Sequence, residues 1–529
     1  MVTWWLEAAA ASPLILAATA FAIPPLSLVI KNRSFWGAYA SVVAGVVLAL
    51  VIGMAKHVLL SGPVSYWFGG WPPPLGIVYV IDGLSAIFAS VIATIIFLTI
   101  TYSAWYMKRY SAGPWYYTLF LLLEAGSLGC VMTGDLFNLF VMIEVLAVSA
   151  YGLVSYFRSS RRSVAASARY AFVGAAATTL YFIAVVFVYG SFGTVNMADV
   201  AVKARGLVDQ SLQAFSGGVY GEVALASTVA IALSLWVFTF KSGLFPNHFW
   251  LPDANAEAPT PVSAAFASAV DAVGIYAVIR LLFTVFGSGS VLEEVGARTV
   301  IFAVLFALGV GSALVGALLM NIQRDVKRVL AYSTISHVGI IYMAIAAAGL
   351  GTPAAASALT ASLYHILTNV VGEALLFLSF GVLIAAAGSR DLGRIAGVGR
   401  APSLIAAVGV VVGVLTLFGV PPFMGFFSKL LVFISLLDSG LVFGAVMLLV
   451  STAISLMGYV KLARAALSSG GEGSKLGPAL PCVIIVVLIV LSIALGVLFP
   501  EVKAVLDHVS RAVVGSVNEY VNALSRVIG

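Results

Sequence analysis

Charged side chains are scarce in this chain. They make up 9% of its 529 residues, whereas about 25% is usual for a soluble protein. Hydrophobic residues reach 62%, the mean hydropathy is +1.10, and apolar runs of membrane-spanning length recur from Ser12 to Leu498 with little between them. A separate soluble catalytic domain is therefore excluded, and the composition predicts a membrane protein.

Cysteine is also rare, which limits the cofactors that we expect. The two cysteines, Cys130 and Cys482, both lie in apolar runs, so that a disulfide framework, an iron–sulfur cluster and a thiolate metal site are all disfavoured. We expect no cofactor and no metal site in this chain. The net charge is +6, but the basic residues are scattered between apolar segments, and nucleic acid is not expected as a partner.

The apolar segments predict an all-α polytopic fold with about fourteen transmembrane helices. The segments are long and uniformly apolar, without the alternation of period two that is typical of a barrel. Their expected limits are 12–30, 36–55, 84–107, 115–133, 136–157, 166–190, 222–245, 260–286, 299–320, 329–349, 354–388, 403–436, 441–466 and 479–499.

The distribution of Lys and Arg predicts the orientation. Of the 27 basic residues, sixteen fall in the loops of one side, Arg400 and Lys475 among them, seven fall on the other side, and four lie within spans. Basic residues in short loops tend to stay in the cytoplasm. Both termini are therefore expected outside, with an even number of spans. After the last span, residues 501–529 are expected to form a short amphipathic surface helix.

Several ionisable residues lie where lipid or helix packing is expected. A charge at the bilayer centre costs about 2.5–3.5 kcal/mol on the insertion scale, so that such residues are candidates for an ion pathway. Arg280, near the end of a span, is expected to reach the interface or to be structural. The pathway candidates are Glu124, Glu144, Arg169, Lys241, Asp271, His337, His365, Glu373 and Lys429, with Asp135 close to a helix start.

Two of these lysines stand beside helix breakers. Ser242, Gly243 and Pro246 follow Lys241, and the segment FGVPPFMGFFSK precedes and includes Lys429. Interrupted spans in corresponding halves are typical of inverted-repeat transporters whose ion path lies near the bilayer midplane. The two lysines fit five-helix repeats at spans four to eight and nine to thirteen, with the seventh and twelfth helices broken.

A buried lysine and a nearby carboxylate form a pair whose protonation changes when one partner moves. Glu144 is the expected partner of Lys241. His337 follows Tyr332, Ser333, Thr334 and Ser336, a hydroxyl-rich turn that suits a water wire. The structural alternatives are a buried pair that only locks helices, a satisfied core histidine and, for Lys429, a side chain that reaches the interface.

Five strings resemble the antiporter-like subunits that are shared by Mrp-type sodium/proton antiporters, respiratory complex I and membrane-bound hydrogenases. The resemblance spans about Leu84 to Ala465 and looks closest to the Mrp D-type subunit and its relatives in ferredoxin-driven complexes of archaea. The strings are GDLFNLFVMIE (134–144), VYGSFGTVNMADV (188–200), FPNHFWLPDANAEAPTPVSA (245–264), RVLAYSTISHVG (328–339) and PPFMGFFSK (421–429).

The resemblance implies fourteen core helices and the same two inverted repeats. It divides the chain into residues 1–110 (helices one to three), 111–287 (first repeat), 288–466 (second repeat) and 467–529 (helix fourteen and tail). It also implies that Glu144 is the family's fifth-helix glutamate, Lys241 its seventh-helix lysine, His337 its tenth-helix histidine and Lys429 its twelfth-helix lysine.

The sequence departs from the family pattern at the centre. Arg169 replaces a residue that is usually lysine, and an arginine does not readily lose its proton. Ala272, beside Asp271, stands where the eighth-helix lysine is expected, and Glu373 stands where many relatives have lysine. Asn369 lies near the position of a usual histidine. Asp271 and Glu373 either form a carboxylate link that favours a cation or a shared proton, or the path is interrupted there.

Three functions follow from the resemblance. The leading hypothesis is a subunit that translocates protons, or another cation, in a multisubunit redox-driven complex of the complex I or hydrogenase type, with no redox cofactor of its own. The alternative is the D-type subunit of an Mrp sodium/proton antiporter without redox partners. The third is a non-conducting scaffold. The expected partners are other membrane subunits and the lipid bilayer, in the plasma membrane of a prokaryote.

Overall fold

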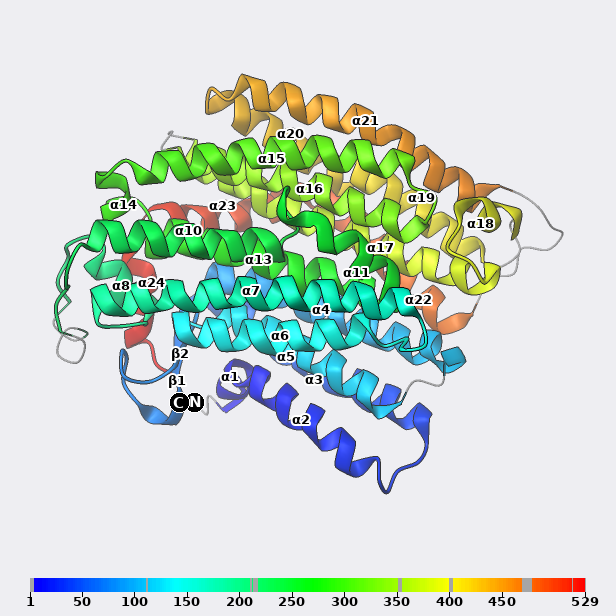
Figure 1. Ribbon diagram of the computed structural model, residues 1–529, viewed down its shortest axis with the longest axis horizontal. Helices are drawn as coiled ribbons and strands as arrows, with labels where there is room; N and C mark the ends of the chain where they lie inside the picture. The colour runs from blue at the N-terminus through cyan, green and yellow to red at the C-terminus, as the bar shows by residue number, and fades with distance from the viewer. Residues whose placement is uncertain are drawn as a thin grey trace.

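The computed structural model describes residues 4–110, 113–209, 212, 217–350, 354–398, 403–468, 478–515 and 517–528. Of the residues used above, Arg400, Lys475 and Gly529 lie outside this described part. Nearly all of the described chain is helical, and its long helices run side by side along the longest axis of the molecule (Figure 1).

The N-terminal part holds the following elements: α1 (Trp4–Ala10), α2 (Ser12–Leu26), α3 (Arg33–Ser61), β1 (Val64–Trp67), η1 (Phe68–Gly70), β2 (Val78–Ile81), α4 (Gly83–Tyr106) and η2 (Met107–Tyr110). The next part holds α5 (Pro114–Met132), α6 (Leu136–Val154), α7 (Arg161–Phe192), α8 (Met197–Lys203), α10 (Val223–Lys241), η3 (Asn247–Trp250), α11 (Leu251–Glu257), α12 (Thr260–Phe266), η4 (Ala267–Asp271), α13 (Ala272–Ile279) and η5 (Arg280–Val285).

The C-terminal part continues with α14 (Val291–Glu294), α15 (Ala297–Ile322), α16 (Val326–Gly349), α17 (Ala355–Ala387), α18 (Leu392–Val398), α19 (Leu404–Phe418), α20 (Met424–Asp438) and α21 (Val442–Leu467). It ends with α22 (Ala479–Val497), α23 (Phe499–Gly515), α24 (Asn518–Asn522) and η6 (Ala523–Ser525).

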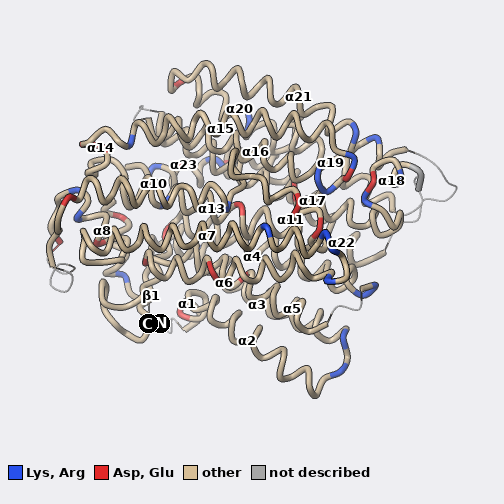
Figure 2. Tube along the Cα trace, in the orientation of Figure 1, with Lys and Arg blue, Asp and Glu red and all other residues tan. Residues whose placement is uncertain are grey.

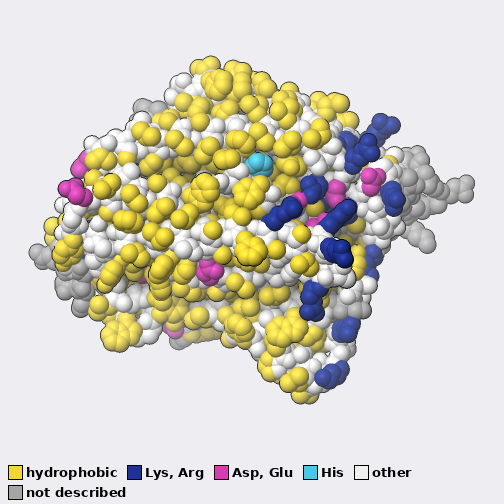
Figure 3. Space-filling model, viewed as in Figure 1, with side chains coloured by type: hydrophobic (Ala, Val, Ile, Leu, Met, Phe, Trp, Pro, Cys, Tyr) yellow, Lys and Arg dark blue, Asp and Glu magenta, His cyan; other side chains and the backbone are white. Residues whose placement is uncertain are grey.

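The long helices make this a polytopic membrane protein. Among the described residues, twelve helices are long and apolar enough to cross a membrane, or thirteen if α1 and α2, which meet at a bend of 68°, form one span. The expected span at 403–436 is instead two helices of 15 residues each, α19 and α20. The face of the molecule that Figure 3 shows is covered mostly by apolar side chains, as expected for contact with lipid or neighbouring subunits.

The two ends of the helix bundle differ in their content of basic residues. The N- and C-termini lie at one end (Figure 1), whereas Lys and Arg gather at the opposite end, around α18 and the connection from α2 to α3 (Figure 2). We call these the terminal end and the basic end. The uneven distribution of Lys and Arg between the two sides, which the loops predicted, is therefore also seen in the folded molecule.

The terminal end holds a small sheet that the sequence analysis did not predict. β1 and β2 pair antiparallel, with Val64 opposite Ile81. The C-terminal segment adds to this hairpin, because Ser65 N–H donates to Arg526 O at 3.0 Å and Ile528 N–H donates to Ser65 O at 2.8 Å. The expected surface helix over 501–529 was thus only partly right: α23 is amphipathic, but it buries Leu506 and Val509, and the chain then turns back to cover a strand edge.

The predicted interruption after Lys241 is present. α10 ends at that lysine, and Gly243 adopts φ +70°, a conformation that side chains with a Cβ rarely take. Two side chains beyond the break hold the open end in place: Trp250 Nε1–H donates to Phe240 O at 2.8 Å, and Asn247 Nδ2–H donates to Thr239 Oγ1 at 3.0 Å. A broken helix is tolerated inside a membrane when such contacts satisfy the freed polar groups.

The predicted interruption before Lys429 is present as well. α19 ends at Phe418; the next residue, Gly419, has a φ of +94°, and α20 starts at Met424. Gly425 lies so close to α19 that an added Cβ would sit 1.6 Å from Thr416 O. The two half-helices therefore meet only because residue 425 lacks a side chain.

The span over 260–285 lies at the centre of the bundle. Its membrane-length window is completely buried, and two π-helical stretches, η4 and η5, interrupt its α-helical hydrogen bonding. π-helical turns are frequent at functional sites because they shift the side chains that follow. Asp271 is the last residue of η4, and Arg280 is the first of η5.

Candidate functional site

Lys241 lies buried at the broken end of α10, against two aromatic rings. Its Nζ is 5.6 Å from the ring centroid of Tyr151 and 5.7 Å from that of Tyr170, which is within range of a cation–π interaction. Within the described residues, Nζ has no hydrogen-bond partner. Gly274 of α13 allows this arrangement, since an added Cβ would lie 3.1 Å from Lys241 Cβ.

The predicted contact between Lys241 and Glu144 is not a direct ion pair. Among the ion pairs of the described residues, in which nitrogen and oxygen lie within 4.0 Å, there is none between Lys241 and Glu144. Glu144, on α6, is only half-buried, and its charge acts on Lys241 from a longer distance. The charge of Glu144 also acts on Tyr151. Lys241, Glu144 and Tyr151 therefore interact electrostatically with one another.

The second half of the molecule contains a continuous chain of hydrogen bonds. Tyr459 OH lies 2.7 Å from Ser333 Oγ and 2.8 Å from His337 Nε2. His337 Nδ1 lies 3.0 Å from His365 Nε2, and His365 Nδ1 lies 3.0 Å from Ser428 Oγ. We call these five side chains, which come from α16, α17, α20 and α21, the polar line.

Ionisable groups stand at both ends of the polar line. Lys429, next to Ser428 in the chain, donates from Nζ to Phe418 O at 2.9 Å and so binds the open end of α19. Its charge acts on both histidines. At the other end, the hydroxyls of Ser333 and Thr334 lie near Glu373, although neither forms a hydrogen bond with its carboxylate.

Asp271, on η4, and Glu373, on α17, are buried carboxylates whose charges interact. Neither carboxylate has a hydrogen-bond partner in the described part of the chain. η4 packs against α17, and the charge of Glu373 acts on Asp271. Two buried carboxylates whose negative charges repel each other cannot both be ionised without a large cost in free energy. A shared proton or a bound cation therefore suits this position. Asn369, also buried, leaves its Oδ1 without a partner among the described residues.

Two predicted pathway residues lie away from this arrangement. Glu124, on α5, is completely buried, and its carboxylate has neither a hydrogen-bond partner nor a charged neighbour that acts on it among the described residues. Arg169 is at the surface: its side chain is 69% exposed, and its Nη1 forms an ion pair of 2.9 Å with Asp253. The structure thus places Arg169 in a surface cluster and not beside Lys241.

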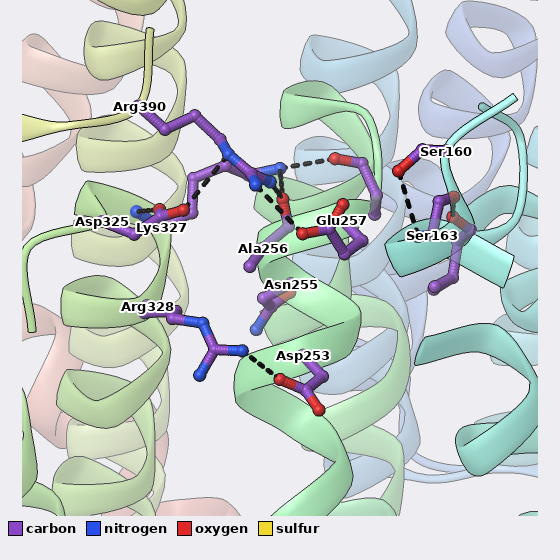
Figure 4. A network of polar contacts seen from close by, with 12 residues as sticks. Ser160, Ser163, Asp253, Asn255, Ala256, Glu257, Asp325, Lys327, Arg328 and Arg390 are labelled. Atoms are coloured by element: carbon purple, nitrogen blue, oxygen red, sulfur yellow. Dashed lines mark hydrogen bonds and ion pairs between the residues drawn. The ribbon is translucent and has the colours of Figure 1, made fainter. Parts of the chain in front are cut away.

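That cluster joins α11 to α16 at the basic end (Figure 4). Arg328 also binds Asp253. Arg390 pairs with Glu257 at 3.0 Å and with Asp325 at 3.1 Å. The amine of Lys327 donates to the carbonyls of Ala256 and Ala258, which terminate α11, where a positive charge is favourable. These contacts fix the segment that follows the break in α10.

A buried ion pair at the terminal end was not predicted. Arg280 binds Asp82 with two hydrogen bonds of 2.7 Å. Burial raises the pKa of Asp82, but the charge and hydrogen bonds of Arg280 lower it more, so that the net pKa is below its usual value. Of the two alternatives for Arg280, the structural one is correct, because its guanidinium is buried and does not reach the interface.

Tyr459 and Ser428 are the functional candidates that sequence reasoning missed. A single tyrosine in an apolar span normally indicates packing, and the partners of Tyr459 lie on one helix, α16, which is distant in the sequence. Only the string ending in Ser428 and Lys429 offered a signal, because it placed a hydroxyl beside a predicted pathway lysine.

Comparison with known proteins identifies the family. The family model described as NADH:quinone oxidoreductase/Mrp antiporter, TM, matches residues 133–455. A second model, described as NADH-ubiquinone oxidoreductase (complex I), chain 5 N-terminus, matches residues 73–117.

The chain is similar to proteins of three kinds of complex. It is 31% identical to the N subunit of the NADH-quinone oxidoreductase of Desulforudis audaxviator over 79% of this chain and 78% of that protein. It is also 31% identical to the D-type subunit of the Na(+)/H(+) antiporter of Alkalihalophilus pseudofirmus, over 78% of each chain. A chain of the membrane-bound sulfane sulfur reductase, an archaeal respiratory membrane complex, superimposes with a TM-score of 0.84 at 25% identity, over 98% of this chain and 100% of that one. The chain therefore belongs to the NADH:quinone oxidoreductase/Mrp antiporter family of antiporter-like membrane subunits, as its motifs predicted.

Proposed function

We propose that this chain translocates protons, or another cation, as a membrane subunit of a multisubunit redox-driven complex, and that it binds no redox cofactor itself. The observation that carries the proposal is the polar line between Glu373 and Lys429. Hydroxyl and imidazole groups at 2.7–3.0 Å are suited to passing a proton, since each both donates and accepts.

The path has two half-sites at broken helices. Lys241 and Glu144 form the first half-site, and Lys429 with His337 and His365 forms the second. Asp271 and Glu373 connect them as a carboxylate link in place of the lysines that the family pattern has there. Movement of a neighbouring subunit changes the charge or hydration at one half-site, and the proton population of the next half-site responds.

The proposal includes fourteen spans, with α1–α2 counted as one span and α19–α20 as another. It also includes inverted repeats over 111–287 and 288–466. The order of elements supports the repeats: a short helix of seven residues follows the third helix of each one, as α8 and as α18. Isolated bridges also correspond, Asp135 with Asn196 in the first repeat and Asp325 with Asp391 in the second.

The location of the termini opposite the basic end supports an outside position for both termini.

The experiment that tests this function uses the assembled complex from a mild-detergent purification of the tagged chain. Its partners and its iron, nickel and flavin contents are measured first. Ion uptake is then measured in vesicles while the redox reaction runs. Lys241→Ala is expected to abolish coupled uptake while the complex remains assembled. Intact uptake in that variant would refute the role of the lysine.

A second candidate function is an ion-gradient-driven antiporter subunit. The identity of 31% to the D-type subunit of a Na(+)/H(+) antiporter favours it, whereas the identity to the N subunit of an NADH-quinone oxidoreductase and the likeness to an archaeal respiratory complex favour redox coupling. Iron–sulfur subunits in stoichiometric amounts would support the first function. Small metal-free membrane partners alone would support the second.

A further inference from the structure

A cavity of about 600 Å³ opens at the basic end, between α15, α18 and α21. Its lining includes three cationic side chains, Arg324, Lys461 and Arg464, and one carboxylate, Asp391. Its lining shares no residue with the two half-sites. It adjoins the cluster of Figure 4, since Leu392 N–H donates to Arg324 O at 3.0 Å, but none of its cations takes part in that cluster.

The positive charge of this cavity is only partly used within the protein. Lys461 donates from Nζ to Asn321 O at 3.0 Å and to Gln323 O at 2.5 Å, which anchors it at the end of α15. Arg324 and Arg464 are exposed, and no carboxylate of the described residues pairs with either one. Two guanidinium groups are therefore available to an anion, and the planar guanidinium is the side chain best matched to phosphate oxygens.

Apolar side chains extend from the cavity toward the middle of the bundle. Leu318 and Ile322 are exposed on the last turns of α15, Ile322 by 71%, and Met457 is 70% exposed on α21. Met457, Lys461 and Arg464 are spaced i, i+4 and i+7, so that they share one face of the helix. An occupant that bound both features would have a phosphate group at one end and hydrocarbon at the other.

We propose that this cavity binds the headgroup of an anionic phospholipid, with Arg324 and Arg464 on its phosphate and the acyl chains along Leu318, Ile322 and Met457. Basic pockets between membrane helices on the cytoplasmic side bind such headgroups, and the cytoplasmic leaflet carries the anionic lipids. The apolar strip distinguishes this ligand from a free phosphate ion, which would gain nothing from it. The site is independent of the proposed ion pathway.

The test measures lipid binding to the assembled complex after detergent delipidation. Native mass spectrometry follows the binding of phosphatidylglycerol, with phosphatidylcholine and inorganic phosphate as comparison ligands. The variant Arg324→Gln/Arg464→Gln is compared with Lys108→Gln/Arg158→Gln, which removes two exposed charges from the same end but outside the cavity. The single change Arg464→Gln serves if the double variant does not assemble.

We expect phosphatidylglycerol to bind the cavity variant roughly tenfold more weakly than the wild type, whereas the control variant and phosphatidylcholine binding change by less than about twofold. Equal losses in both variants would mean diffuse charge attraction and would overturn the proposal. Displacement of phosphatidylglycerol by millimolar phosphate would identify a free-anion site instead. Loss of a neighbouring subunit with unchanged lipid binding would assign the surface to protein docking.

Discussion

The two half-sites hold their lysines in different ways. Lys241 contacts the faces of Tyr151 and Tyr170 and has no hydrogen-bond partner among the described residues. Lys429 is hydrogen-bonded to a carbonyl and stands beside a chain of hydroxyl and imidazole groups. One half-site is therefore built from aromatic rings, and the other from polar atoms within hydrogen-bond distance.

This difference indicates which half-site has to move. In the second half, a proton can pass along the five side chains of the polar line without a change in backbone structure, because each step between them is 3.0 Å or less. In the first half, the amine of Lys241 must swing from its rings, or water must enter, before a proton leaves it. We infer that conformational control acts at the first half-site.

Loss of either lysine is expected to have the largest effect. Lys241→Ala and Lys429→Ala each remove the charged group of a half-site, and we expect coupled ion uptake to fall by roughly 10² or more. Uptake into vesicles containing the assembled complex is the measurement, with Lys56→Ala, an exposed helical lysine, as the control. Normal uptake in both variants would contradict the two-site account.

The polar line is tested by removing one oxygen atom. Tyr459→Phe keeps the ring but breaks the link between Ser333 and His337, and we expect uptake to fall at least about tenfold. Tyr364→Phe is the matched control, because that hydroxyl donates to Leu495 O at 2.6 Å and, among the described residues, takes no part in the polar line. Similar losses in the two variants would show that the hydroxyl of Tyr459 is structural.

The carboxylate link is tested by neutral amides of equal size. Glu373→Gln is expected to lower uptake several-fold, because an amide does not take up and release a proton. Ala272→Lys with Glu373→Lys restores the lysines of the family pattern and is expected to change uptake in either direction. If neither change affects the measured ion uptake, the result supports the hypothesis of a non-conducting scaffold.

The smallest effect is expected at the aromatic half-site. The hydroxyl of Tyr170 has no partner in the described chain, so that Tyr170→Phe should leave uptake within about twofold of wild type. Tyr170→Leu, which removes the ring face, should weaken the site by about 0.5–2 kcal/mol and lower uptake several-fold. If Phe and Leu behave alike, the ring has no electrostatic role.

Sequence patterns predicted the breaks but not the connections between them. Pro246 and Gly419 disrupt helices locally, and this effect is visible without a structure. Burial of Asp271 and Glu373 follows from their apolar surroundings. The surface position of Arg169 could not be predicted, because spacing along α7 does not tell which side of the helix faces the core. The contacts of Tyr459 depend on the packing of α21 against α16, which lies more than 100 residues earlier in the chain, and no local pattern encodes them.

The hairpin was missed for a similar reason. β1 and β2 are four residues each, and short apolar strands between Gly and Pro look like a loop when longer apolar runs surround them. Their stability depends on the C-terminal segment, which arrives more than 400 residues later in the chain. Pairing over such a separation leaves no periodic signal in the sequence.

The most direct test of the central claim compares Tyr459→Phe with Tyr170→Phe in complexes that contain equal amounts of the chain. Both changes remove one hydroxyl from a buried tyrosine, and ion uptake during the driving reaction is measured for each. If the polar line carries the ion, uptake falls at least about tenfold in the first variant and stays near the wild-type value in the second. Equal uptake in the two variants would contradict the account.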